Sequence, residues 1–133
     1  MPSEKLRVLI VDDNADGVDA LGDVLETYGY QVLRAYSGRE ALALAATDLP
    51  DLAIIDVNMP AIDGIETARR LASLADPHSI RMIAYTGSAA APVSPAAPEQ
   101  PFDVVVSKGA PIDLLIRVIR SGPTLFERDA GTI

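Results

Sequence analysis

Three aspartates, a threonine and a lysine stand where apolar segments of this sequence end, in an order that suits phosphoryl chemistry. Asp12 and Asp13 follow the first apolar segment, and Asp56 follows the third. Thr86 follows the fourth segment, and Lys108 follows the fifth. If these segments are parallel strands of one sheet, their carboxyl ends lie along one edge, and the five side chains converge there.

Clustered carboxylates at that edge favour a divalent cation. Like charges that lie close together raise one another's pKa, and a bound cation removes the repulsion. Ligands that are all oxygen favour Mg²⁺ or Mn²⁺. Together with such a cation, the lysine ammonium and the threonine hydroxyl would stabilise charge on a transferring phosphoryl group. Asp56 would be the nucleophile and would form an acyl phosphate.

The elements that must position these residues are visible in the hydrophobic spacing. Five short apolar segments alternate with helical patterns, and the first is apolar enough for a strand that is buried on both faces. The segments are Leu6–Val11, Gln31–Ala35, Leu52–Ile55, Ile80–Tyr85 and Val104–Val106. This alternation predicts right-handed crossovers and a parallel sheet covered on both faces, which is an α/β fold.

Four helices are predicted around these strands. The first has its apolar face at Val18, Leu21, Leu25 and Tyr28. The second begins at Ser37 and Glu40, which have the form of a capping box. The third begins near Asp63 and is predicted to bury Ile65, Ala68, Leu71 and Ala72. The last has its apolar face at Ile112, Leu115, Ile116 and Ile119.

The interval between the fourth and fifth strands departs from this pattern. Pro92, Pro95, Pro98 and Pro101 recur at every third residue. Because proline in a helix interior costs about 3 kcal/mol or more, the helix expected here is predicted to be missing or reduced to a turn. The segment Pro92–Pro101 is then either a tolerated surface loop or an extended ligand for a partner.

The composition limits the classes of function. The length of 133 residues fits one domain, predicted at residues 1–121, with residues 122–133 as a tail or linker fragment. A net charge of −8 argues against direct binding of nucleic acid. Without cysteine, and with His78 as the single histidine, the chain cannot build a thiolate site or a multi-histidine zinc site. No apolar segment approaches the roughly 20 residues that cross a bilayer, and no signal-peptide pattern begins the chain, which predicts a cytoplasmic protein without membrane insertion.

Several segments resemble the receiver domain of two-component response regulators and hybrid histidine kinases. They are Val8–Asn14, Ile54–Gly64, Thr86-Gly87 and Ser107-Lys108. The second contains the specific pattern Asp-x-x-Met-Pro-x-x-Asp-Gly, and the resemblance extends from Leu6 to Ser121. It implies a flavodoxin-like (βα)5 doubly wound sheet with strand order 2-1-3-4-5.

The resemblance also implies a function. A histidine kinase or phosphotransfer protein would phosphorylate Asp56, and Mg²⁺ would be held by the side chains of Asp13 and Asp56 and the backbone carbonyl of Asn58, with Asp12 reaching it through water. An unknown downstream protein would recognise the altered surface formed by the proline-rich interval, the fifth strand and the last helix. Such a chain is not an enzyme beyond assisting its own phosphorylation and dephosphorylation.

Two positions depart from the pattern of the family. Val105 stands three residues before Lys108, where the family commonly has an aromatic residue that moves with Thr86. Tyr85 is a candidate substitute, but strand alternation predicts that its side chain points away from Thr86. Gly109 follows Lys108 where the family usually has proline, which predicts a more flexible loop of different shape.

Two other functions compete with a switching receiver. A degenerate receiver that acts as a fixed docking module would account for Val105 and Gly109, although the complete set of site residues argues against it. A Mg²⁺-dependent aspartyl phosphatase similar to the haloacid dehalogenase family would need a second aspartate where this sequence has Asn58. It would also need a cap domain, for which the chain has no room. Both a single-domain regulator and the receiver of a longer protein fit the sequence.

Overall fold

Five parallel strands form a single sheet in a computed structural model that describes residues 6–57, 59, 64–76, 79–87 and 102–120. The strands are β1 (Arg7–Val11), β2 (Gln31–Ala35), β3 (Leu52–Ile55), β4 (Arg81–Thr86) and β5 (Val104–Ser107). Their order in the sheet is β2-β1-β3-β4-β5. This order confirms the predicted α/β, flavodoxin-like architecture, and each strand lies within one residue of its predicted bounds.

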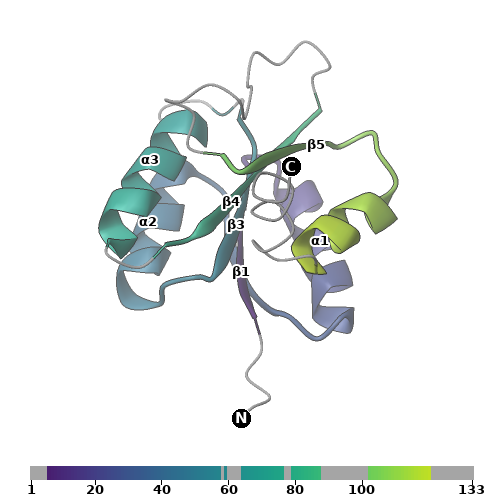
Figure 1. Cartoon of the computed structure of the whole chain (residues 1–133), viewed down its shortest axis with the longest axis horizontal. Coiled ribbons are helices and arrows are strands. Elements are labelled where there is room, and N and C mark those ends of the chain that lie inside the picture. Colours follow the sequence, from purple (N-terminus) through teal and green to yellow (C-terminus); the bar gives the residue numbers. More distant parts are fainter. Residues whose placement is uncertain (1–5, 58, 60–63, 77–78, 88–101, 121–133) are drawn as a thin grey trace, which may run out of the picture.

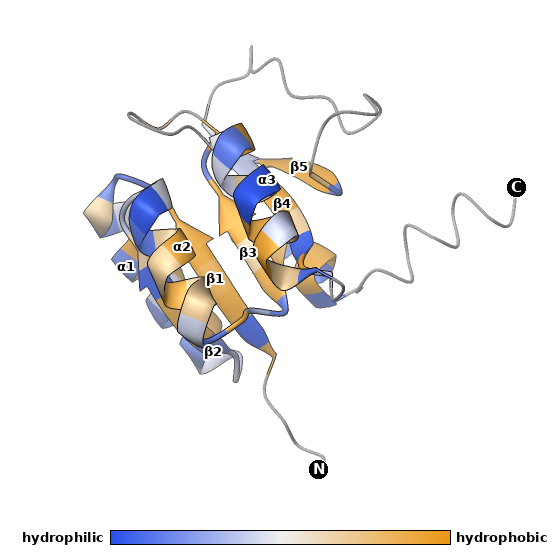
Figure 2. Ribbon diagram, turned by 90° about the vertical axis from the view of Figure 1, so that its left-hand side faces the viewer, coloured by the Kyte–Doolittle hydropathy of each residue, from blue (hydrophilic) through white to orange (hydrophobic). Residues whose placement is uncertain are grey.

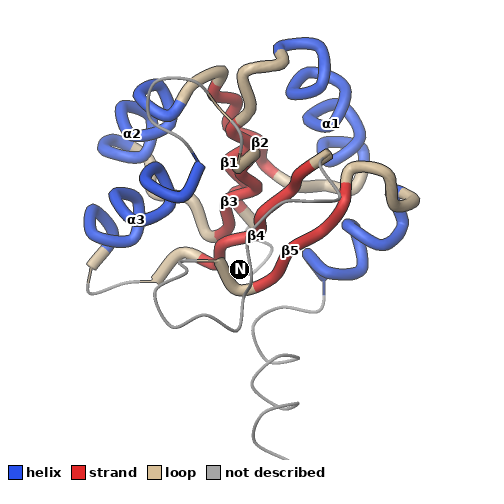
Figure 3. The backbone as a smooth tube through the Cα atoms, turned by 90° about the horizontal axis from the view of Figure 1, so that it is seen from above, coloured by secondary structure: helices blue, strands red, loops and turns tan. Residues whose placement is uncertain are grey.

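Helices cover both faces of the sheet. They are α1 (Ala15–Thr27), α2 (Gly38–Thr47), α3 (Gly64–Ala75) and a helix over residues 112–120, called the last helix below. Figure 1 shows α2 and α3 on one side of the sheet, and α1 with the last helix (yellow-green) on the other. Figure 3 shows the same two layers from above.

Each face of the sheet has its own apolar cluster because successive residues of a strand point to opposite faces. In β1, Leu9 and Val11 belong to the cluster under α2 and α3, whereas Val8 and Ile10 belong to the cluster under α1 and the last helix. All four of these side chains are buried. Burial on both faces explains why β1 is a continuous apolar segment, which Figure 2 shows as a largely orange strand between β2 and β3.

The buried face of α3 differs from the predicted one. Ala72 is exposed, whereas Thr67 and Ala75 are buried together with Ala68 and Leu71. The buried residues of α3 recur every three or four positions from Gly64, as one face of a helix does. Ala72 lies beside this face and not on it. At α2 the predicted cap is confirmed, because the Ser37 hydroxyl accepts a hydrogen bond of 3.1 Å from the Glu40 N–H.

An arginine from the edge strand β2 holds α1 in place. The Arg34 guanidinium lies over Gly22, where an added Cβ would come within 2.6 Å of its Cζ. It pairs with Asp23 at 3.0 Å, Asp19 at 3.4 Å and Glu26 at 3.5 Å. Because Gly22 has no side chain, the guanidinium can lie against the helix, close to three acidic residues of α1.

The start of α3 packs against the end of β3. A Cβ added at Gly64 would lie 2.2 Å from the carbonyl oxygen of Asp56 and 2.7 Å from the Cα of Val57. The Gly64 N–H also donates a hydrogen bond of 3.1 Å to the Val57 carbonyl. Glycine therefore permits an approach of helix and strand that any side chain would prevent.

Several sequence predictions fall on residues outside the described part of the chain. They concern the Asn58 carbonyl, the cap at Asp63, the missing or reduced helix within residues 88–101 with its segment Pro92–Pro101, and the tail at residues 122–133. The domain boundary at residue 121 likewise stays a prediction.

Replacing Gly64 with alanine is expected to destabilise the protein. The new methyl group would overlap the backbone of Asp56 and Val57, and overpacking of this kind typically costs about 1–3 kcal/mol. Urea unfolding measures the decrease in the free energy of unfolding. Gly17→Ala in α1 is the matched control, because the nearest atom to its added Cβ is 3.6 Å away and alanine favours a helix. Equal stability of the two variants would contradict the close approach at Gly64.

Candidate functional site

Three carboxylates meet at the carboxyl ends of β1 and β3. Asp12 and Asp56 come directly after the paired residues Val11 and Ile55, and the Asp56 N–H donates a hydrogen bond of 2.9 Å to the Val11 carbonyl. One ligand oxygen from each of Asp12, Asp13 and Asp56 lies within 4.8 Å of the others. The structure thus brings together the three aspartates that the sequence places at this edge.

Burial differs among the three carboxylates. Asp12 is 7% exposed and Asp56 is 8% exposed, whereas Asp13 is open to solvent. Two negative charges are therefore held in a partly dehydrated environment, where their repulsion is screened less than at the surface. Groups of opposite charge are needed to stabilise them.

Asn14 fixes Asp12 from the α1 side. The Asn14 N–H donates a hydrogen bond of 3.0 Å to Oδ1 of Asp12. The Asn14 side chain is also the N-cap of α1, and accepts a hydrogen bond of 3.2 Å from the Gly17 N–H. Sequence reasoning did not single out this residue, although an asparagine directly before a helical pattern is the usual signal for a cap.

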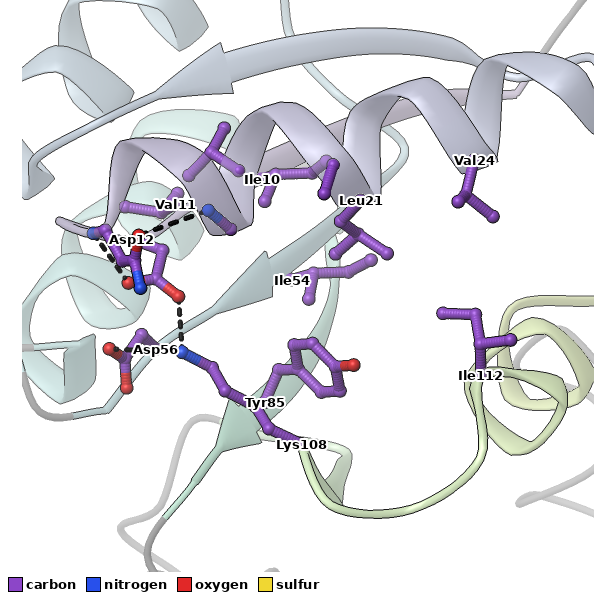
Figure 4. A pocket seen from close by; sticks show the side chains of 14 residues that line it. Ile10, Val11, Asp12, Leu21, Val24, Ile54, Asp56, Tyr85, Lys108 and Ile112 are labelled. Carbon is purple, nitrogen blue, oxygen red and sulfur yellow. Dashed lines mark hydrogen bonds and ion pairs between the residues drawn. The ribbon is translucent and has the colours of Figure 1, made fainter.

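Lys108 supplies the positive charge of the site. Its Nζ lies 2.5 Å from Oδ2 of Asp12 and 3.7 Å from Oδ2 of Asp56. Figure 4 shows Lys108 extending toward both aspartates. Burial by itself would lower the pKa of the ammonium, but the hydrogen bond to Asp12 and the charges of Asp12 and Asp56 outweigh that effect and raise it. Lys108 therefore remains charged at neutral pH.

The turn that carries Lys108 is closed by Ser107. The Gly109 N–H donates a hydrogen bond of 3.1 Å to the Ser107 hydroxyl, and the Ala110 N–H donates one of 3.1 Å to the Ser107 carbonyl. The Lys108 N–H donates one of 2.9 Å to the carbonyl of Thr86. The loop thus has a defined form without proline, and a serine two residues before a glycine is the turn signal that sequence reasoning overlooked.

Thr86 ends β4, the strand next to β3. It is 3% exposed, so the residue is buried at the carboxyl end of this strand. Val105 packs on the cluster under α2 and α3, whereas Tyr85 packs on the cluster of the opposite face. Tyr85 therefore points away from the face of Val105, in agreement with the strand alternation.

The donor set fits a small divalent cation. Three carboxylates and one ammonium leave a net negative charge on the described residues of the site, and all the ligand atoms are oxygen. Mg²⁺ and Mn²⁺ prefer such ligands, and exposed Asp13 leaves a route from solvent. Asp12, Asp13 and Asp56 are the residues that would hold the cation.

The sequence matches a known family along most of its length. Residues 8–120 match the family described as "Response regulator receiver domain". The response regulator MprA of Mycolicibacterium vanbaalenii is 45% identical over 53% of this chain and 31% of its own length. The protein PilH of Pseudomonas aeruginosa is 38% identical over 60% of this chain and 66% of its own length. The match thus spans about a third of MprA and two-thirds of PilH.

Solved structures have the same fold. A CheY-like receiver domain from Methanospirillum hungatei has a TM-score of 0.81 at 26% identity, over 95% of this chain and 99% of its own. The response regulator TrrA of Thermotoga maritima, solved with Mg²⁺-BeF, has a TM-score of 0.74 at 27% identity, over 87% and 97%. TrrA has also been solved in complex with the histidine kinase ThkA. Among the described residues of the present chain, no helix is long and apolar enough to cross a membrane.

Mg²⁺ is expected to raise the thermal midpoint of unfolding, because it relieves the repulsion among the three carboxylates and binds only the folded chain. At a Mg²⁺ concentration of a hundred times its dissociation constant, binding adds about 2.7 kcal/mol to the free energy of unfolding. Asp13→Asn should remove most of this gain. Asp16→Asn is the matched control, since Asp16 is an exposed residue of the first turn of α1 outside the cluster. The same Mg²⁺ response in both variants would contradict the assignment.

Proposed function

The chain belongs to the response regulator receiver domain family, and we propose that it accepts a phosphoryl group on Asp56 from a histidine kinase or phosphotransfer protein. The observation that carries this proposal is the position of the buried Asp56 beside Asp12, Asp13 and the ammonium of Lys108. Of the residues in this cluster, Asp56 is the one that follows the central strand β3. The matched structures of TrrA with Mg²⁺-BeF and with a histidine kinase support the same class of chemistry.

Each residue of the site has a role in the transfer. A carboxylate oxygen of Asp56 attacks the phosphorus, and the bond from phosphorus to the donor nitrogen breaks. Lys108, which lies 3.7 Å from Asp56, neutralises charge on the phosphoryl oxygens, and the hydroxyl of Thr86 donates a hydrogen bond to one of them. When bound, Mg²⁺ supplies further positive charge to the carboxylates and the phosphoryl group.

Lys108 connects phosphorylation to the rest of the fold. In the unphosphorylated chain its ammonium is 2.5 Å from Asp12, and a new dianion on Asp56 competes for that ammonium. Lys108 begins the turn between β5 and the last helix, so a change of its partner acts on both elements. We infer that this response serves a cytoplasmic signalling pathway whose downstream partner is a protein and not nucleic acid, in keeping with the net charge of −8.

A receiver that does not switch is the second candidate, and Val105 favours it. The side chain of Val105 is part of the packed face under α2 and α3 and has no ring that could move with Thr86. Backbone amide spectra before and after phosphorylation separate the two candidates. Changes in β5 and the last helix support a switch, whereas changes confined to the neighbours of Asp56 support a fixed docking module.

Asp56→Asn is expected to abolish phosphorylation and leave the fold intact. Intact mass after incubation with Mg²⁺ and acetyl phosphate measures the gain of one phosphoryl group. Asp16→Asn is the control, because it removes a neighbouring exposed carboxylate that lies outside the cluster. A phosphorylated Asp56→Asn protein would show that the acceptor is another residue.

Lys108→Ala is expected to slow phosphorylation by tenfold or more. The variant removes the ammonium from a position 3.7 Å from Asp56, where a charge pair is worth about 4 kcal/mol at an effective dielectric constant of 20. The rate is measured by the same mass assay. Arg39→Ala removes a cation from the exposed surface of α2 and serves as the control. Equal rates in the two variants would exclude a role for Lys108 in the transfer.

A further inference from the structure

Lys108 directly follows β5, which is an edge strand of the sheet. Among the described strands, β4 is the single neighbour of β5, and the paired residues at its end are Thr86 and Ser107. The N–H of Lys108 donates a hydrogen bond of 2.9 Å to the carbonyl of Thr86. The sheet therefore holds the backbone of Lys108 from one side only, and further contacts are needed to fix its position.

The side chain of Lys108 gives little precision by itself, because its ammonium is carried on a flexible stem of four carbons. Before phosphorylation, the carboxylates of Asp12 at 2.5 Å and Asp56 at 3.7 Å hold this ammonium. When a phosphoryl group reaches Asp56, the ammonium exchanges part of its contact with Asp12 for a contact with a phosphoryl oxygen. During this exchange, its position depends on how firmly the backbone of Lys108 is held.

Ser107 closes the turn over Lys108 with two acceptor atoms. Its carbonyl accepts a hydrogen bond of 3.1 Å from the Ala110 N–H, which makes residues 107–110 a four-residue turn with Lys108 in second place. Its hydroxyl accepts one of 3.1 Å from the Gly109 N–H. The first bond needs only backbone atoms, whereas the second needs a side-chain acceptor at residue 107. The side chain at this position therefore decides whether the turn has a second hydrogen bond.

Gly109 takes part in this contact through its N–H and not through the conformational freedom of glycine. Its backbone is not in the left-handed region, so a residue with a side chain could adopt it. A Cβ added at Gly109 would lie 3.5 Å from the hydroxyl oxygen of Ser107, which is an ordinary contact distance. The hydroxyl of Ser107 is thus the group that responds to residue 109, and it does so by a direct hydrogen bond.

We propose that Ser107 is a positioning residue for phosphoryl transfer: its hydroxyl, through the Gly109 N–H, fixes the turn that carries Lys108 and so holds the ammonium beside the phosphoryl group. Ser107 acts through Lys108 and does not touch the phosphoryl group itself. The inference rests on the proposed function, because Asp56 is again the acceptor. Without the hydroxyl, the turn keeps its backbone hydrogen bond but adopts more conformations, and fewer chains hold the ammonium in place.

Ser107→Thr and Ser107→Val form the matched pair for the test. Both side chains are branched at Cβ and similar in shape, and residue 107 is exposed, so the added methyl groups have room. Threonine keeps the acceptor, and valine lacks it. A hydrogen bond of this kind changes an equilibrium by a factor of about two to twelve. With Mg²⁺ and acetyl phosphate, Ser107→Thr should be phosphorylated close to the wild-type rate and Ser107→Val about three to ten times more slowly, as measured by intact mass.

Two further measurements separate positioning of Lys108 from general damage to the site. The dissociation constant of Mg²⁺ should be the same in both variants, because the three aspartates of the cluster lie outside the turn. Exchange of the Gly109 amide with water should be faster in Ser107→Val than in Ser107→Thr, because that variant lacks the acceptor. Ser79→Val removes an exposed hydroxyl before the start of β4 and should keep the wild-type rate of phosphorylation.

The step through Lys108 is tested in a second background. In Lys108→Ala the ammonium is absent, so the turn has nothing left to position. Ser107→Val and Ser107→Thr should then react at one equal, slow rate, which longer incubation measures. A difference between the two that persists without Lys108 would show that residue 107 acts on the site by another route, and would overturn the proposal.

The possible results separate this inference from the proposed function. Equal rates in Ser107→Thr, Ser107→Val and the wild type would overturn the positioning role and leave Asp56 as the acceptor. An equal loss of rate in both variants would show that the size of the side chain matters and not its hydroxyl, which overturns the role as well. So would a weaker affinity of Ser107→Val for Mg²⁺. No phosphorylation of the folded, Mg²⁺-loaded wild-type chain would count against both.

Discussion

Three carboxylates that repel one another lie together at one edge of the sheet. Asp12 and Asp56 are buried there, and Asp13 lies within ligand distance of both. Lys108 offsets part of the negative charge, and the remainder creates a site for a divalent cation. In the absence of a cation, the repulsion among these carboxylates lowers the free energy of unfolding. The same negative charge attracts the cation, and the bound cation would in turn attract a phosphoryl group.

Contacts between backbone atoms help to hold these charged residues in place. The Asp56 N–H is bound to the carbonyl of Val11, and the start of α3 reaches the carbonyl of Asp56 because Gly64 has no side chain. The turn closed by Ser107 directs Lys108 toward the carboxylates.

Two residues next to the site, Val105 and Tyr85, lie on opposite faces of the sheet. Val105 is packed on the face under α2 and α3. Tyr85 brings an aromatic ring to the opposite face, beside α1 and the last helix. In this chain the aromatic side chain next to the site therefore lies on the face opposite to Val105.

The hydrophobic pattern predicted a parallel α/β sheet, the ends of its strands and the convergence of the aspartates with Lys108, because buried parallel strands that alternate with helices place their carboxyl ends at one edge. The strand order came from the resemblance to receiver domains. The pattern also placed Ala72 on the buried face of α3 with Ala68 and Leu71, but about 60° of rotation around the helix separates the exposed Ala72 from the buried Ala75. Only the tertiary structure shows that Asp12 is the partner of Lys108 and that Arg34 of β2 contacts α1. These depend on distances between segments far apart in the chain, and such distances are set by packing and not by local pattern.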